Sequence, residues 1–167
     1  MLSEQQAWQV LEAVPDPEIP VISVTELGIV RDIARDSVDG VDGLRVVVTP
    51  TYSGCPATEL IEESIRTALL DAGATAVTVE TRLAPPWTTD WITAAARDKL
   101  RAYGIVPPGA GAAATAAQPV RFMRRQLACP RCGSEDTERL AEFGSTACKA
   151  TYRCKSCLEP FEYFKPI

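Results

Sequence analysis

The chain has 167 residues, of which 46% are hydrophobic and 23% charged, a composition typical of a small globular protein. No segment approaches the roughly 18 apolar residues of a membrane span, and the N-terminus lacks the basic and apolar regions of a signal peptide. We therefore expect a cytoplasmic protein without a membrane partner. There is no histidine, which excludes histidine metal ligands and Ser-His or Cys-His nucleophile pairs.

Patterns in residues 1–104 predict an α+β domain of order αββαβα with a mixed sheet. Ser3 and Gln6 form a capping box that starts the first helix. Leu60, Ile61 and Ile65 lie on an apolar stripe of the second helix, which ends before Gly73. The strand before this helix and the strand after it are expected to be parallel, because a crossover joins them. The expected strands span residues 28–35, 44–49 and 76–82, and the last helix spans residues 89–103.

The rest of the chain divides into a linker and a small module. Residues 105–120 are uncharged and rich in Pro, Gly and Ala, as expected of a linker. Residues 121–167 form a separate module that is too short to bury a stable core without help. A bound metal would supply what this core lacks.

Paired cysteines give the strongest chemical signal. Cys129 and Cys132 form one C-x-x-C knuckle, and Cys154 and Cys157 form a second one after 21 residues. Each knuckle presents two sulfurs to one ion, so together they predict a tetrahedral zinc site at the ends of two β-hairpins. Iron, an iron–sulfur centre or disulfides are the alternatives.

Cys148 lies between the knuckles. It is either a small, partly buried residue or an accessory, exchangeable metal ligand.

A second candidate site lies around Cys55, which follows a strand and precedes Pro56 at the start of a helix. The helix dipole there favours a thiolate. The alternative is an ordinary buried cysteine. Asp16 and Glu18 lie in a Pro-rich loop, where turn formation is the simpler interpretation. Trp87, Trp91 and Tyr103 are expected in the core.

Charge argues against nucleic-acid binding. Residues 1–120 carry 16 acids and 8 bases, whereas residues 121–167 carry 9 bases and 6 acids. Four thiolates and one zinc ion would leave the module close to neutral, without the clustered basic face of a nucleic-acid binder.

Three motifs of the first domain, Asp16–Pro20, Thr25–Gly28 and Thr51–Pro56, resemble the iron–sulfur assembly domain shared by SufT and PaaD proteins. The knuckles and the segment 143–150 are similar to the tail of the PaaD family, whose members are accessory subunits of phenylacetyl-CoA epoxidase.

The resemblance implies a factor for maturing metal centres in phenylacetate degradation, with no catalysis of its own. Its partners would be the oxygenase and reductase subunits of the epoxidase. Cys55 would be the reactive cysteine and Asp16 the loop acid, with Glu18 and Thr51 in the same motifs. A transient iron ion or iron–sulfur cluster at Cys55 and a homodimer stay open. The alternative function is a zinc-ribbon module that binds nucleic acid or other proteins. A diiron oxygenase subunit is excluded, since such sites use histidine.

Overall fold

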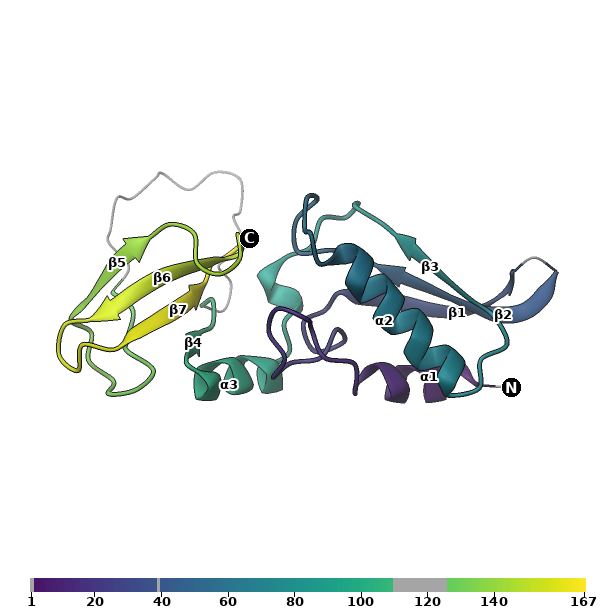
Figure 1. Ribbon diagram of the computed structural model, residues 1–167, viewed down its shortest axis with the longest axis horizontal. Helices are drawn as coiled ribbons and strands as arrows, with labels where there is room; N and C mark the ends of the chain where they lie inside the picture. Colours follow the sequence, from purple (N-terminus) through teal and green to yellow (C-terminus); the bar gives the residue numbers. More distant parts are fainter. Residues whose placement is uncertain (1, 39, 110–125) are drawn as a thin grey trace. The chain divides into compact units, whose positions relative to one another are not determined.

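The computed structural model describes residues 2–38, 40–109 and 126–167. It contains two compact units, the first formed by Met1–Trp87 and Trp91–Thr93, the second by Thr88–Asp90 and Ala94–Ile167. Each unit has its own sheet (Figure 1). None of the helices in the described ranges is both long and apolar enough to cross a bilayer.

The first unit contains a three-stranded mixed sheet of order β1-β2-β3. Strands β1 (Val30–Val38) and β2 (Val41–Val48) are antiparallel, and β3 (Val77–Thr81) is parallel to β2. The expected mixed sheet and its parallel pair are confirmed.

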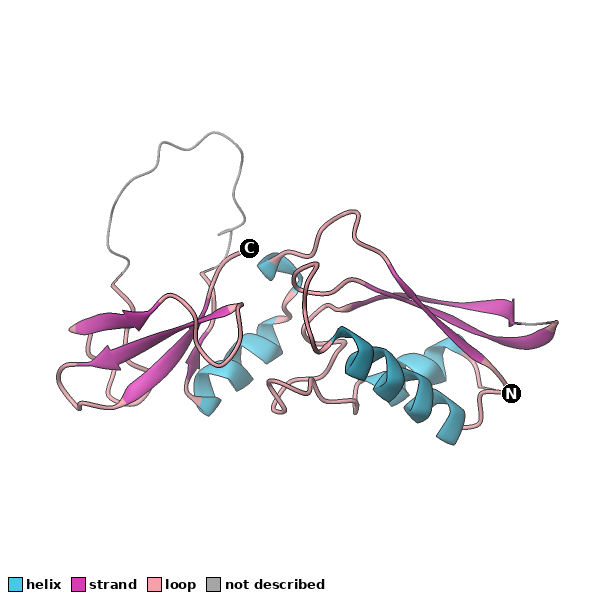
Figure 2. Ribbon diagram, turned by 45° about the horizontal axis from the view of Figure 1, so that its top comes forward, coloured by secondary structure: helices cyan, strands magenta, loops and turns pink. Residues whose placement is uncertain are grey.

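Helices α1 (Glu4–Leu11) and α2 (Thr58–Asp71) lie on one side of this sheet (Figure 2). The capping box of α1 is present, with Gln6 N–H donating to Ser3 Oγ at 3.2 Å and Ser3 N–H donating to Gln6 Oε1 at 2.9 Å. In α2, the buried stripe passes through Ile61, Ile65 and Leu69. Leu60 lies beside this stripe and is 55% exposed, so its expected burial is wrong.

The connection from α1 to β1 is long but firmly folded. Asp16 N–H donates to Ile22 O at 2.9 Å, and Val24 N–H donates to Val14 O at 3.0 Å. The connection ends at Gly28, where φ is +75° and a Cβ atom would lie 2.7 Å from Trp91 Cβ. Only glycine fits there, which explains its place in the motif Thr25–Gly28.

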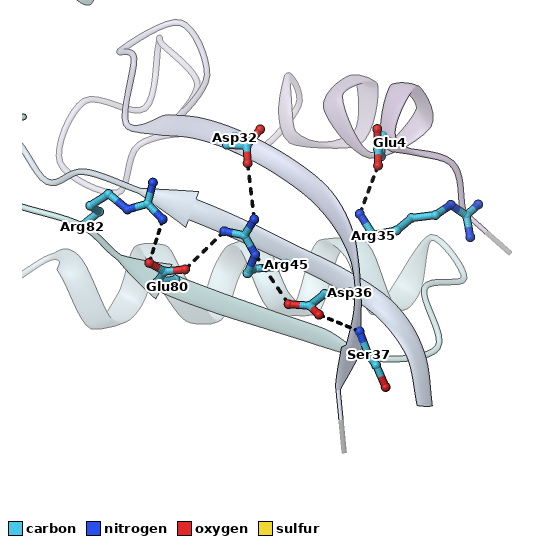
Figure 3. A network of polar contacts seen from close by, with 8 residues as sticks. All are labelled: Glu4, Asp32, Arg35, Asp36, Ser37, Arg45, Glu80 and Arg82. Carbon is cyan, nitrogen blue, oxygen red and sulfur yellow. Dashed lines mark hydrogen bonds and ion pairs between the residues drawn. The ribbon is translucent and has the colours of Figure 1, made fainter. Parts of the chain in front are cut away.

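A charged network ties the three strands together (Figure 3). The Arg45 guanidinium on β2 lies 3.7 Å from Asp32 and 3.5 Å from Asp36 of β1, and 3.2 Å from Glu80 of β3. A hydrogen bond from Arg82 is the main cause that lowers the pKa of Glu80. Because the carboxylates of this network are largely exposed, solvent screens each pair and its contribution to stability is small.

The second unit contains α3 (Ala94–Tyr103) and a four-stranded sheet of order β4-β7-β6-β5. Strands β5 (Thr137–Ala141), β6 (Lys149–Cys154) and β7 (Pro160–Phe164) form an antiparallel meander. Strand β4 (Ile105–Val106) pairs parallel to β7. The fold class is therefore mixed α and β, with a ribbon-like sheet at the C-terminus.

Two features differ from the sequence-based expectation. The helix expected over residues 89–103 is a short 3₁₀ turn, η1 (Thr89–Trp91), followed by α3. Trp87 is buried, but Trp91 is half-buried and Tyr103 is 55% exposed, so the core assignment of Tyr103 is wrong. The chain leaves the helix at Gly104, and Ile105 supplies the next buried side chain.

The second unit also begins earlier than the sequence boundary at residue 121. It includes α3, which the sequence pattern grouped with the first domain, and β4, which the composition placed in the linker. Residues 110–125, which cover most of the expected linker and the start of the expected module, lie outside the described residues.

Candidate functional site

Four cysteine sulfurs converge at one end of the C-terminal sheet. The Sγ atoms of Cys129, Cys132, Cys154 and Cys157 all lie within 4.8 Å of one another. Two separations are shorter, at 3.7 Å between Cys129 and Cys157 and 3.5 Å between Cys132 and Cys154. A tetrahedral ion with Zn–S bonds of about 2.3 Å needs sulfurs about 3.8 Å apart. The four sulfurs therefore fit one zinc ion.

The backbone shapes both knuckles in the same way. In the first, Gly133 N–H donates to Cys129 O and Cys129 N–H to Ser134 O, both at 2.9 Å. In the second, Cys154 N–H donates to Glu159 O at 3.0 Å. The residue after each second cysteine has a positive φ, +75° at Gly133 and +65° at Leu158. These tight turns aim both sulfurs of each pair at one point.

The knuckles rest on a small apolar cluster. Leu127, Phe161 and Tyr163 pack with Cys129 and Cys154, and Tyr152 lies against them. The ring centroids of Tyr152 and Phe161 are 5.7 Å apart in a stacked pair. The strands β6 and β7 thus place one side of the sulfur group on an apolar core.

The thiols of the second knuckle titrate very differently. A hydrogen bond from the Cys157 N–H lowers the pKa of Cys154 to about 6. At Cys157, the Glu159 N–H favours the thiolate, but burial and the neighbouring sulfurs outweigh it and raise the pKa to about 12. Four thiolates this close repel one another, so the donor set is suited to a dication.

Cys148 lies outside the group of four within the described residues. It is 5% exposed, and its Sγ atom lies 3.0 Å from Thr146 Oγ1. This burial fits the small-residue interpretation, and its role as an accessory ligand stays a prediction.

Next to Cys148, a buried ion pair organises the ribbon. The Lys149 ammonium is 3% exposed and lies 2.7 Å from Glu162 Oε2. Glu162 Oε1 accepts hydrogen bonds from Ser145 N–H at 3.0 Å and Ser145 Oγ at 2.8 Å. Sequence reasoning missed this pair, although a lysine inside the small-residue segment 147–150 was a usable signal.

The Cys55 loop differs in detail from the expectation. Helix α2 begins at Thr58 with Ala57 as its N-cap, so Pro56 is not the first helical residue. The reason is a turn, in which Cys55 O accepts hydrogen bonds from Thr58 N–H at 3.2 Å and Thr58 Oγ1 at 2.9 Å. The N-cap makes no side-chain hydrogen bond, and Cys55 is half-buried.

The loop acid Asp16 accepts hydrogen bonds from the backbone of its own loop. Asp16 is 5% exposed, and its Oδ1 accepts hydrogen bonds from Glu18 N–H at 2.9 Å and Ile19 N–H at 2.8 Å. Thr51 is also buried and Glu18 half-buried. In the part of the chain that the structure describes, Cys55, Asp16 and Glu18 belong to no group of three or more potential metal ligands. Their functional roles stay a prediction.

The comparisons with known proteins cover both units. A protein from Escherichia coli (strain K12), named as a subunit of 1,2-phenylacetyl-CoA epoxidase, is 51% identical over 97% of this chain and 92% of its own length. The chain belongs to the PaaD family. Residues 114–165 match the PaaD zinc beta ribbon domain, and residues 4–81 match a family described as iron–sulfur cluster assembly protein.

Other relatives of this PaaD-family chain match only part of it. The Fe-S protein maturation auxiliary factor YitW of Bacillus subtilis (strain 168) is 36% identical over 59% of this chain and 86% of its own length. A crystal structure of a domain of unknown function from Bacillus anthracis matches 58% of this chain and 90% of that domain, with 26% identity and a TM-score of 0.51.

Proposed function

We propose that this protein is an accessory factor that helps to mature a metal centre of a phenylacetyl-CoA epoxidase, in the cytoplasm. The observation that carries the proposal is the pairing of an iron–sulfur assembly domain with a PaaD ribbon in one chain, 51% identical to a relative named as a subunit of such an epoxidase. The clients would be the diiron oxygenase subunit or the iron–sulfur reductase.

The residues of the chain agree with a role before catalysis. The absence of histidine removes the ligands that a diiron oxygenase site uses. The four-cysteine group would hold a zinc ion with a structural role, since all four positions are filled by protein sulfur. Cys55 is half-buried on a loop, where a thiol can meet a client or carry iron or sulfur transiently.

The alternative, a nucleic-acid-binding ribbon, has weaker support. Residues 126–167 contain six basic side chains, and five of them pair with a carboxylate of the same unit. The sixth, Lys165, donates to Glu142 O at 3.0 Å and lies over the Phe143 ring. Cations held in this way are poorly placed to neutralise phosphates. A protein-interaction role is already part of the maturation proposal.

The test is deletion of the gene for this protein in cells that produce all other epoxidase components. We expect the oxygenase and reductase to accumulate with underfilled metal centres, measured by elemental analysis of the purified proteins. A Cys55→Ala variant should reproduce the deletion if Cys55 handles metal or sulfur. Cys148→Ser is the matched control, because this thiol is buried in the other unit. In the deletion cells, this variant should restore the metal content of the oxygenase and reductase.

A second assay separates maturation from catalysis. Oxygenase and reductase purified with full metal content should turn over without this protein. If they stay inactive until it is added, it is a working subunit and the maturation proposal is wrong.

A further inference from the structure

The four cysteine residues that would hold the metal differ strongly in their exposure. Cys129 is 3% exposed and Cys154 0%, Cys157 is half-buried, and Cys132 is exposed. Gly133, the next residue, has no side chain to shield Cys132, and a Cβ atom there would meet nothing within 4 Å. Among the four, Cys132 is therefore the residue most open to solvent and small solutes.

The sulfurs also differ in the hydrogen bonds that they accept. Cys154 Sγ accepts the Cys157 N–H at 3.5 Å. For Cys132 Sγ, the described residues provide no backbone N–H donor, and its partner is Cys154 Sγ at 3.5 Å. An N–H bond withdraws charge from a thiolate, so a sulfur without one is the better nucleophile. Cys132 is thus both the most accessible ligand and one of the least stabilised.

We propose that Cys132 is the oxidation site of the ribbon and that Cys154 is its resolving partner. Hydrogen peroxide would convert the pair into a disulfide that joins the two knuckles. This removes two of the four metal ligands, so the metal ion is lost from the site. The maturation role does not require this property.

The chemistry balances in two steps. The Cys132 thiolate attacks one peroxide oxygen, the O–O bond breaks, and hydroxide leaves while a sulfenic acid forms. The Cys154 thiolate then attacks the sulfenic sulfur, expels a second hydroxide and closes the S–S bond. The two sulfurs lose two electrons, which reduce the peroxide, and two protons from solvent turn the hydroxides into water.

Cys154 is assigned as the resolving partner because its Sγ atom is in contact with that of Cys132. The Cys132–Cys154 separation of 3.5 Å must shrink to about 2.05 Å, which side-chain rotation and small backbone shifts allow. Cys148 does not compete, because it is 5% exposed and lies outside the group of four.

The test uses the full-length, zinc-loaded protein and stepwise addition of hydrogen peroxide. Alkylation with mass spectrometry maps each cysteine, and a chromogenic chelator reports released zinc. We expect Cys132 to lose its thiol first among the four ligands, a Cys132–Cys154 disulfide to be the first cross-link, and one zinc to be released per disulfide. First oxidation at another ligand, or a first cross-link other than Cys132–Cys154, overturns the proposal.

Variants give a second, independent measurement. Cys132→His keeps a ligand for zinc and should retain it at peroxide levels that empty the wild-type site, whereas Cys148→Ser should release zinc as the wild type does. Equal zinc release by Cys132→His and the wild type overturns the proposal. If Cys132→His fails to fold, the order of cysteine oxidation in the wild-type protein, mapped by mass spectrometry, still tests the proposal.

Discussion

At the scale of single residues, the two knuckles contain the same left-handed backbone conformation but place different residues in it. Gly133 and Leu158 each follow the second cysteine of a knuckle, and both have left-handed backbone angles. A side chain in this region costs about 1–2 kcal/mol, which glycine avoids. Leu158 is 69% exposed, so packing of its side chain offsets little of this conformational strain.

The first prediction concerns substitutions at these two positions. Leu158→Gly should stabilise the second unit by roughly 0.5–1 kcal/mol, the relief of strain less the greater freedom of glycine in the unfolded chain. Gly133→Ala, the matched change in the other knuckle, should destabilise it by a similar amount. Denaturant unfolding of the zinc-loaded protein measures both. A clear loss of stability in Leu158→Gly would show that the leucine side chain is needed for packing.

At the scale of elements, the hairpin of β6 and β7 depends on one ion pair. Lys149 lies in β6 and Glu162 in β7, and Glu162 also holds the loop before β6 through Ser145. Burial alone would raise the pKa of Glu162, but the hydrogen bonds from Lys149 and Ser145 outweigh it and lower the pKa. The carboxylate form is therefore favoured more strongly in the folded state than in the unfolded chain.

The second prediction follows from the sign of that shift. Because the folded pKa lies below the unfolded value of about 4.3, the pair contributes fully at neutral pH and is lost as pH falls through the folded pKa. Glu162→Gln should cost about 3 kcal/mol at pH 7, since it leaves a buried ammonium without a counter-charge. The difference in the free energy of unfolding between this variant and the wild type should become smaller as pH falls below about 4.3.

Denaturant unfolding of both proteins at several pH values measures this gap. The comparison matters because acid also displaces zinc from both proteins by protonating their thiolates. Lys149→Met combined with Glu162→Gln should recover part of the loss. A gap that does not change with pH would contradict the assigned role of the carboxylate.

Elements with strong local signals were predictable from the sequence. The capping box of α1 and the crossover between β2 and β3 depend on neighbouring residues, and both were confirmed. Strand β5 has a largely exposed, polar sequence without alternation, and β4 has only two residues. Both exist because of partners far along the chain, which a single sequence does not reveal.

The candidate site shows the same division. The convergence of the four cysteines was predictable because the C-x-x-C spacing is itself local geometry. The start of α2 was not, since the turn at Cys55 depends on two hydrogen bonds from Thr58. The pairing of Lys149 with Glu162 requires the register of β6 and β7, which only the folded sheet provides.

At the scale of the whole molecule, the two units should differ in their need for metal. The first unit has its own core, in which Leu11, Val46 and Ile65 are buried. The ribbon of the second unit has the small cluster of Leu127, Phe161 and Tyr163 beneath the sulfurs. A zinc ion bound by the four cysteines would therefore supply much of the folding free energy of the ribbon and little of that of the first unit.

The third prediction is selective unfolding on metal removal. A strong chelator, or Cys154→Ser, should unfold β5, β6 and β7 and leave the first sheet intact. Because β4 pairs with β7, amide protection should also fall in Ile105 and Val106. Hydrogen exchange followed by mass spectrometry measures this segment by segment, with Cys148→Ser as the control. Loss of protection in β1 and β2 would show that the units are not independent.

The membership of α3 and β4 in the second unit has a consequence for how such a protein can be assembled from parts. A gene fusion that joined a ribbon to a new partner at the alanine-rich stretch would leave β4 and its buried Ile105 behind. A transfer that keeps the second sheet whole must begin before Ile105, and one that also keeps α3 must begin before Ala94. The boundary along which this module can be exchanged therefore lies before α3 in the sequence, well ahead of the low-complexity stretch that looks like a domain boundary.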